Sequence, residues 1–139
     1  MPGVRELLDK LAPNKTVCLA LGTGNIERAA RMKLRHLNVE SFFPVGGFGE
    51  FTEERRELLA DAVKNASHHF QCTFSPQNTW VIGDTAYDIE GAQALGLRAL
   101  GVATGGLFSM DDLRRAKPDL LFEDLSDTER VIASLNIKD

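Results

Sequence analysis

Predicted helices and strands alternate along almost the whole chain, and this alternation is the feature that most limits how it can fold. Apolar residues at helical spacing predict helices at 4–11, 26–37, 54–70 and 88–95, a short helix from 109, and a last helix that starts with a capping box at 126–129. Short apolar runs bounded by turn residues predict strands at 16–21, 45–48, 79–82, 98–102 and 120–122. Because strands that alternate with helices form parallel sheets, we expect an α/β fold with helices on both faces of the sheet.

The size and charge of the chain exclude several classes of protein. Its 139 residues are the usual size of one domain, so a single domain over 1–139 is expected. The 20 acidic and 16 basic residues give a net charge of −4 without a basic cluster, which argues against nucleic acid as a partner. No apolar run approaches the roughly 20 residues of a membrane span, and no signal-peptide pattern starts the chain, so no membrane partner and a cytoplasmic location are expected.

The two cysteines, Cys18 and Cys72, lie far apart in the sequence, beside apolar or aromatic residues. Metal and redox motifs need closer partners than these two residues have in the sequence. We therefore expect both cysteines to be buried free thiols.

Two aspartates, Asp84 and Asp88, follow the predicted strand at 79–82, where the chain turns into a helix. The carboxyl ends of strands in open α/β sheets are where such folds bind ligands. Two carboxylates 4 Å apart repel by about 4 kcal/mol at an effective dielectric constant of 20, and a hard cation removes this cost. Mg²⁺ is usually held by one or two carboxylates and phosphate oxygens. The alternative is structural: Asp84 caps the helix, and Asp88 is favourable at its amino end.

A glycine-containing loop, Leu-Gly-Thr-Gly-Asn at 21–25, joins a predicted strand to a predicted helix. The backbone of Gly24 and Asn25, the hydroxyl of Thr23 and the helix dipole could together bind a phosphate group. A dinucleotide fingerprint would need a further glycine where Glu27 stands, so NAD binding is disfavoured. The alternative is a turn in which the glycines only satisfy backbone geometry.

Two arginines, Arg55 and Arg56, begin the long predicted helix. A cation at a helix amino end is unfavourable by a few tenths of a kcal/mol, which suggests an anionic partner. A solvated charge pair among neighbouring glutamates explains them equally well. Tyr87 could line a pocket, and the loop at 104–106 could border a site or be only a turn.

Taken together, these residues resemble the haloacid dehalogenase superfamily of phosphatases, near its phosphoglycolate phosphatase-like members, over nearly the whole chain. The resemblance implies a three-layer α/β/α, Rossmann-like parallel sheet. Thr23 corresponds to the residue of the family's second motif that holds the phosphate, and Asp84 and Asp88 correspond to the acids of the fourth motif that hold Mg²⁺. The third motif usually supplies a lysine; none stands there, so Arg56, or less strongly Arg55, would replace it.

The family's nucleophile lies in an Asp-x-Asp-Gly-Thr motif at the end of its first strand, and no Asp-x-Asp occurs in this chain. The cap domain that follows that strand in the family is also absent. The resemblance therefore implies the carboxyl-terminal part of such an enzyme. In the family, the missing strand lies between those predicted here at 16–21 and 79–82. Either these two strands pair directly, or a second copy or an N-terminal fragment completes the sheet, or buried backbone groups stay unpaired at about 1–3 kcal/mol each.

The function implied by the resemblance is Mg²⁺-dependent hydrolysis of a phosphate monoester. With no nucleophile in the chain, no catalytic residue is assigned, and the isolated chain is expected to be inactive. The alternative is a non-catalytic module, derived from such a phosphatase, that binds a phosphorylated small molecule or acts as a scaffold.

Overall fold

The computed structural model describes residues 1–137 and divides the chain into two compact units, which are described separately. The first unit joins Met1–Val17 to the segment that begins at Ser75, and the second unit is Cys18–Phe74. The expectation of a single domain stays a prediction. No helix among the described residues combines the length and the apolar character that crossing a membrane requires.

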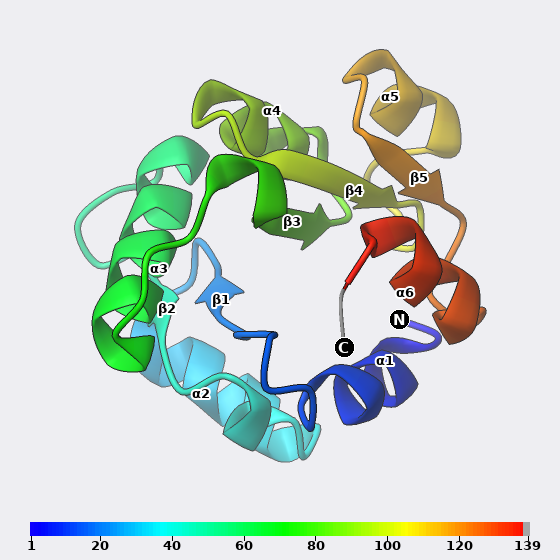
Figure 1. Ribbon diagram of the computed structural model, residues 1–139. Coiled ribbons are helices and arrows are strands. Elements are labelled where there is room, and N and C mark those ends of the chain that lie inside the picture. Colours follow the sequence, from blue (N-terminus) through cyan, green and yellow to red (C-terminus); the bar gives the residue numbers. More distant parts are fainter. Residues whose placement is uncertain (138–139) are drawn as a thin grey trace. The chain divides into compact units, whose positions relative to one another are not determined.

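The first unit is built on a parallel sheet whose strand order is β3-β4-β5. Its strands are β3 (Trp80–Gly83), β4 (Arg98–Val102) and β5 (Leu120–Phe122). On one side of the sheet lie α4 (Ala86–Ala94) and α5 (Met110–Arg115), and on the other lie α1 (Val4–Leu11) and α6 (Thr128–Leu135) (Figure 1). The 3-10 helix η2 (Pro76–Asn78) leads into β3. This arrangement confirms the predicted parallel sheet with helices on both faces.

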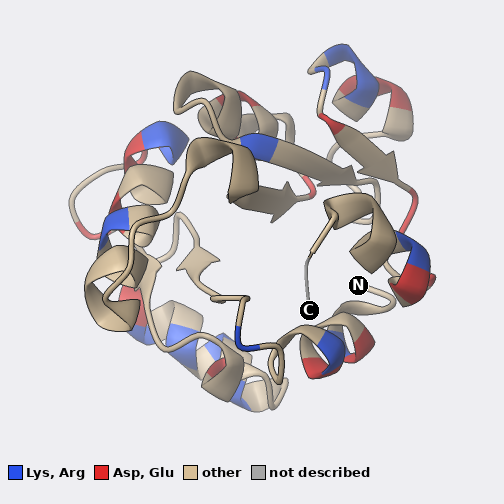
Figure 2. Cartoon of the chain, in the orientation of Figure 1, with Lys and Arg blue, Asp and Glu red and all other residues tan. Residues whose placement is uncertain are grey.

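The core of the first unit lies between the central strand and α4. Ile89 and Ala92 of α4 are fully buried against Ala99 of β4 and Leu113 of α5. β3 is less enclosed than expected for a buried strand, because Ile82 keeps 38% of its surface exposed. The reason is that β3 lies at the edge of its sheet, with a strand neighbour on one side only. α5 is rich in acidic and basic residues (Figure 2). Arg114 pairs with Asp111, and Arg115 pairs with Asp112.

The second unit contains a small parallel sheet packed against a long helix. Its strands β1 (Leu21–Gly22) and β2 (Gly46–Gly47) pair along two residues. The helices are α2 (Glu27–His36), α3 (Arg55–Phe70) and the 3-10 helix η1 (Glu40–Phe42). α3 buries Leu58, Leu59, Ala62 and Ala66, and it lies so close to β2 that a Cβ at Gly47 would overlap the carbonyl of Leu58. A glycine is therefore required where the strand meets the helix.

The predicted strand at 16–21 is mostly wrong, because only Leu21 of that range enters a ladder. The N–H of Leu21 donates to Val45 O (3.1 Å), and that of Thr23 donates to Gly47 O (3.1 Å). An apolar run forms a strand only where a partner offers backbone groups, and β2 is too short to pair with residues 17–20. The ladders of the described residues run β1-β2 and β3-β4-β5, so direct pairing of the strands predicted at 16–21 and 79–82 is not among them.

A largely enclosed arginine connects α2 to the segment that enters β2. The side chain of Arg31 is only 15% exposed, and its guanidinium donates to the carbonyls of Phe43 and Pro44. The same guanidinium lies 5.6 Å from the centre of the Phe48 ring. These contacts let one side chain satisfy backbone carbonyls that no strand covers.

Candidate functional site

Asp84 lies in the turn that joins β3 to α4, at the carboxyl end of the strand, and Asp88 lies in the first turn of α4. Thr85 is the N-cap of α4, and its Oγ1 accepts a hydrogen bond from the N–H of Asp88 (3.2 Å). In return, Asp88 Oδ2 accepts from Thr85 Oγ1 (2.9 Å) and from the Thr85 N–H (3.3 Å). These reciprocal bonds form a capping box. The alternative in which Asp84 caps this helix is wrong, because Thr85 does so, while Asp88 does lie at the favourable amino end.

Each of the two carboxylates lies directly against the backbone of a glycine. A Cβ at Gly83 would overlap the carboxylate of Asp88, and a Cβ at Gly105 would overlap the carboxylate of Asp84. Neither glycine has a positive φ angle, so these positions are restricted by space and not by backbone conformation. The loop after β4 therefore borders Asp84. The sequence alone left open whether this loop borders a site or is only a turn.

The residue before Gly105 contributes a buried hydroxyl. Thr104 Oγ1 is inaccessible to solvent and has no hydrogen-bond partner among the described residues. Leaving such a group unpaired costs about 1–3 kcal/mol. Because solvent does not reach this oxygen, a ligand could reach it only after a local shift of the loop. The sequence indicated this loop only through its glycines, and no local pattern distinguished Thr104.

An aromatic pair lies beside the same turn. Tyr87, which is 57% exposed, packs edge to face on Phe108, with ring centres 5.6 Å apart. The next residue along from the loop glycines, Leu107, is 74% exposed. That Tyr87 lines a ligand pocket stays a prediction.

The residues at this turn fit a magnesium ion. The described residues contain no group of three or more His, Cys, Asp or Glu side chains suited to hold a metal. Mg²⁺ needs fewer protein ligands than that, because waters and phosphate oxygens complete its octahedral shell. The Asp84 carboxylate, which packs against the backbone of Gly105, is a hard oxygen donor of the kind that Mg²⁺ prefers. Asp88 Oδ2 already accepts hydrogen bonds from Thr85. Metal binding by Asp84 and Asp88 stays a prediction.

The predicted phosphate loop lies in the second unit, between β1 and α2. Thr23 Oγ1 accepts a hydrogen bond from the N–H of Asn25 (3.2 Å), and the carbonyl of Asn25 accepts from the N–H of Gly49 (2.9 Å). A Cβ at Gly49 would overlap the carbonyl of Gly24, so Gly49 must be a glycine for the two segments to lie this close. The loop is therefore braced by the segment after β2.

The amino end of α2 already has a carboxylate. Glu50 Oε1 accepts a hydrogen bond from the N–H of Glu27 (2.7 Å), the first residue of the helix. A phosphate group at this helix end would therefore lie near a second negative charge, the carboxylate of Glu50, which already interacts with the positive end of the helix dipole. At the loop itself, no atom occupies the space where a Cβ of Gly24 would lie. The Thr23 hydroxyl accepts a hydrogen bond from Asn25, so its own proton can be donated to another group. Phosphate binding by Thr23, Gly24 and Asn25 stays a prediction.

The two arginines at the start of α3 differ in exposure. Arg56 is 58% exposed and lies 3.8 Å from the carboxylate of Glu54, an ion pair on the surface. Arg55, the first residue of the helix, is half-buried. Arg56 as a phosphate ligand stays a prediction, and Arg55 holds the more enclosed position.

Comparison with known proteins places these features in a family. A family model described as HAD-hydrolase-like matches residues 55–128, a little over half of the chain. Phosphoglycolate phosphatase from Synechococcus elongatus is 28% identical over 134 residues, which cover 96% of this chain and 59% of that protein. The chain thus spans about three fifths of the length of this curated relative.

Solved structures agree on the fold. A haloacid dehalogenase-like family hydrolase from Streptococcus pneumoniae matches with a TM-score of 0.76 at 21% identity, over 95% of this chain and 59% of that one. A haloacid dehalogenase-like protein of unknown function from Agrobacterium tumefaciens matches with a TM-score of 0.73 at 18% identity, over 97% and 60%. With the parallel sheet, the acidic turn after β3 and the matching family model taken together, the chain belongs to the haloacid dehalogenase-like hydrolase family.

Proposed function

We propose that this chain is the metal- and phosphate-holding part of a Mg²⁺-dependent phosphatase that acts on a phosphate monoester. The observation that carries the proposal is the turn after β3, where Gly105 makes room for Asp84 and Thr85 holds Asp88 in a capping box. Membership of the haloacid dehalogenase-like family and the similarity to a phosphoglycolate phosphatase support it.

Each group has a distinct role in the proposal. Mg²⁺, when bound, supplies positive charge that offsets the charge on the phosphoryl oxygens. Asp84 binds the ion, and Asp88 is the second acid, oriented by Thr85. Thr23 and the backbone of Gly24 and Asn25 donate hydrogen bonds to the phosphoryl oxygens. Arg56, or Arg55 in its place, pairs with the same anion, because a guanidinium makes charge-assisted hydrogen bonds with phosphate.

The nucleophile must come from outside the sequence described, since these 139 residues contain no Asp-x-Asp. The curated relative is longer than this chain, which covers 59% of it. We therefore assign the nucleophile to a further polypeptide segment, which would also add a strand to the sheet. The chain by itself should bind Mg²⁺ and phosphate without appreciable turnover, because covalent catalysis needs the attacking carboxylate.

Ligand binding by the isolated chain tests the proposal directly. Trp80 lies on β3, shortly before Asp84, so its fluorescence is a suitable signal. We expect saturable responses to Mg²⁺ and to inorganic phosphate, and at least a tenfold loss of Mg²⁺ affinity in Asp84→Asn, with Asp61→Asn as a matched control on the exposed face of α3. Absence of a response to both ligands, checked by calorimetry, would overturn the proposal.

Turnover tests where the nucleophile lies. Para-nitrophenyl phosphate should be hydrolysed no faster by the wild-type chain than by Asp84→Ala. A rate that survives purification and disappears in Asp84→Ala would show that the attacking group is within these residues. The mass from size-exclusion chromatography then tells whether a second copy of the chain completes the sheet.

The same absence of Asp-x-Asp favours a second candidate, a non-catalytic module that binds a phosphorylated small molecule. The coding sequence upstream of Met1 separates the two. An Asp-x-Asp segment encoded there supports the phosphatase. A true start at Met1, together with a stable monomer that binds phosphate, supports the binding module.

A further inference from the structure

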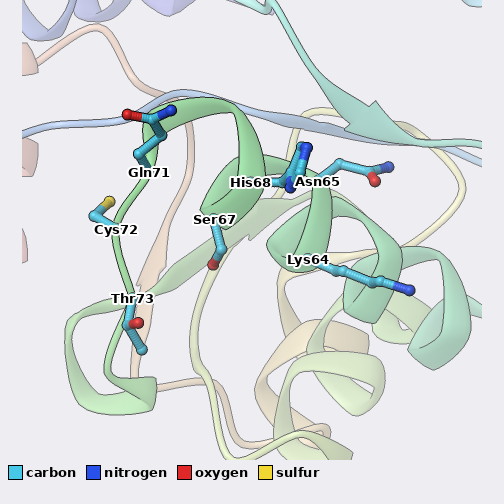
Figure 3. A pocket seen from close by; sticks show the side chains of 7 residues that line it. All are labelled: Lys64, Asn65, Ser67, His68, Gln71, Cys72 and Thr73. Carbon is cyan, nitrogen blue, oxygen red and sulfur yellow. The ribbon is translucent and has the colours of Figure 1, made fainter.

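A polar hollow of about 520 Å³ lies at the end of α3 in the second unit (Figure 3). The side chains that line it are Lys64, Asn65, Ser67, His68, Gln71, Cys72 and Thr73. The Lys64 side chain points away from Cys72, so these polar groups do not converge on one ligand (Figure 3).

One of the lining residues corrects an expectation from the sequence. Cys72 is exposed, Cys18 is half-buried, and both thiols are free. The expectation of two buried thiols is therefore wrong for Cys72. The reason is that Cys72 follows the left-handed residue Gln71 (φ 53°), which ends α3 at the surface.

A second place in the same unit, the amino end of α2, is occupied by a carboxylate from a distant part of the chain. Glu50 Oε1 accepts a hydrogen bond from the N–H of Glu27, the first residue of the helix, at 2.7 Å. The residue before the helix is the apolar Ile26, whose side chain makes no cap. The N–H groups of a first helical turn have no partner within the helix, so a side chain or an anion takes them. Glu50 therefore supplies the acceptor that the local sequence lacks.

The Glu50 carboxylate is held next to the predicted phosphate loop. The N–H of Gly49 donates to the carbonyl of Asn25 (2.9 Å), and a Cβ at Gly49 would overlap the carbonyl of Gly24. An anion bound where a loop enters a helix uses the N–H groups of the first turn and the positive end of the dipole. The Glu50 oxygen therefore takes the N–H of Glu27 that an oxygen of a bound phosphate group would use.

The Glu50 side chain is free to move into solvent. Glu50 is exposed, and the next side chain, that of Phe51, is fully exposed. Interactions of an exposed carboxylate contribute little to stability, because water competes for the same groups. Release of Glu50 from the helix end would therefore leave the packing of α3 on the small sheet as it is.

We propose that Glu50 is an autoinhibitory carboxylate, which occupies the anion position at the amino end of α2 and is displaced when a phosphate group binds at Thr23, Gly24 and Asn25. The inference rests on the proposed phosphate site and adds its regulation. Two effects oppose the ligand: Glu50 repels its negative charge, and it occupies the Glu27 N–H. In a phosphatase, the return of Glu50 to the helix end assists the release of inorganic phosphate.

Glu50→Gln separates the charge from the hydrogen bond, because the amide keeps an acceptor oxygen for the Glu27 N–H. The full chain is titrated with inorganic phosphate, without Mg²⁺, and binding is measured by calorimetry. We expect Glu50→Gln to bind phosphate several-fold more tightly than wild type. Glu53→Gln, which removes an exposed charge from the same segment, is the matched control and should gain much less. Circular dichroism establishes that each variant is folded, and Glu50→Ala serves as a second variant that also frees the Glu27 N–H.

Backbone amide NMR tests the displacement itself. In the wild type, the amide proton signal of Glu27 should move as phosphate is added, because its acceptor changes. A Glu27 signal that stays in place while the amides of Gly24 and Asn25 respond would show that Glu50 remains bound to the helix, which overturns the proposal.

The results also separate this inference from the proposed function. If wild type binds phosphate and neither Glu50 variant binds it more tightly, Glu50 is only a helix cap and the phosphate site stands. If wild type and both Glu50 variants all fail to bind phosphate, the phosphate site itself is wrong, and the inference falls with it.

Discussion

The backbone of Gly105 packs against the carboxylate of Asp84 so closely that even one methyl group would overlap it. Asp84 follows β3, and Gly105 follows β4, the strand paired with β3 in parallel register. The ends of two adjacent strands therefore determine where this carboxylate lies. Because Gly105 has no positive φ angle, contact with Asp84 is the reason for glycine at this position.

Gly105→Ala should destabilise the protein by about 1–3 kcal/mol, the usual cost of inserting an atom into a filled space. The same substitution made in Asp84→Ala should cost much less, since the carboxylate it displaces is gone. Urea denaturation of the four proteins in this cycle measures the coupling. Equal costs in both backgrounds would show that the clash is with something other than Asp84.

Thr85→Ala should cost about 1 kcal/mol, because it removes an N-cap side chain. It also removes the hydroxyl that donates to Asp88, so Asp88 loses part of its orientation. Thr85→Ser keeps both hydrogen bonds and should be near wild type. Denaturation midpoints measure the effect, and a Thr85→Ser protein as unstable as Thr85→Ala would argue that the methyl group, not the cap, is what matters.

Thr104→Val should leave stability unchanged or raise it slightly in the absence of ligand. The substitution replaces a buried hydroxyl that has no partner with a methyl group of similar shape, which removes a desolvation cost. Thermal unfolding without metal is the measurement, with Thr104→Ser as the variant that keeps the hydroxyl. A melting temperature that falls by several degrees in Thr104→Val would mean that the hydroxyl is hydrogen-bonded in solution.

Acid should destabilise the protein through Asp112. Hydrogen bonds from the backbone and side chain of Ser109 lower the pKa of this carboxyl from its usual 3.8. Since the folded protein binds this proton less readily than the unfolded chain, the stabilisation is present above about pH 4 and is lost as the pH falls through the lowered pKa. Ser109→Ala removes the side-chain part of this effect and keeps the backbone part, so it should lower the urea midpoint somewhat more at pH 7 than at pH 2.5. A difference that stays constant with pH would contradict the assignment.

A second carboxyl adds to the same acid sensitivity. Hydrogen bonds from the Ser126 side chain and backbone lower the pKa of Asp124, with the same sign and the same pH window. Ser126→Ala should behave as Ser109→Ala does. The double variant should show the sum of the two effects, since the two pairs share no residue.

The cap of the last helix shows what a local sequence pattern can and cannot predict. The capping box expected at 126–129 does not form, because Ser126 donates its hydroxyl to Asp124, and Asp127 caps α6 by accepting from the Arg130 N–H (3.2 Å). The existence and position of the helix were predicted, and the identity of its cap was not. Each of several consecutive polar residues could cap the helix. The hydrogen bond from Ser126 to Asp124, a residue outside the motif, left Asp127 as the cap.

The sequence by itself determined the succession of elements, the parallel α/β class, the strands at Arg98–Val102 and Leu120–Phe122, and the acidic turn after β3. These features follow from apolar periodicity and turn residues, which act within a few positions of the chain. Only the tertiary structure decided that Gly105 bounds Asp84 and that Leu21, but not the apolar run before it, finds a strand partner. The physical reason is that each of these contacts joins residues far apart in the sequence, so it depends on how packed elements bring them together.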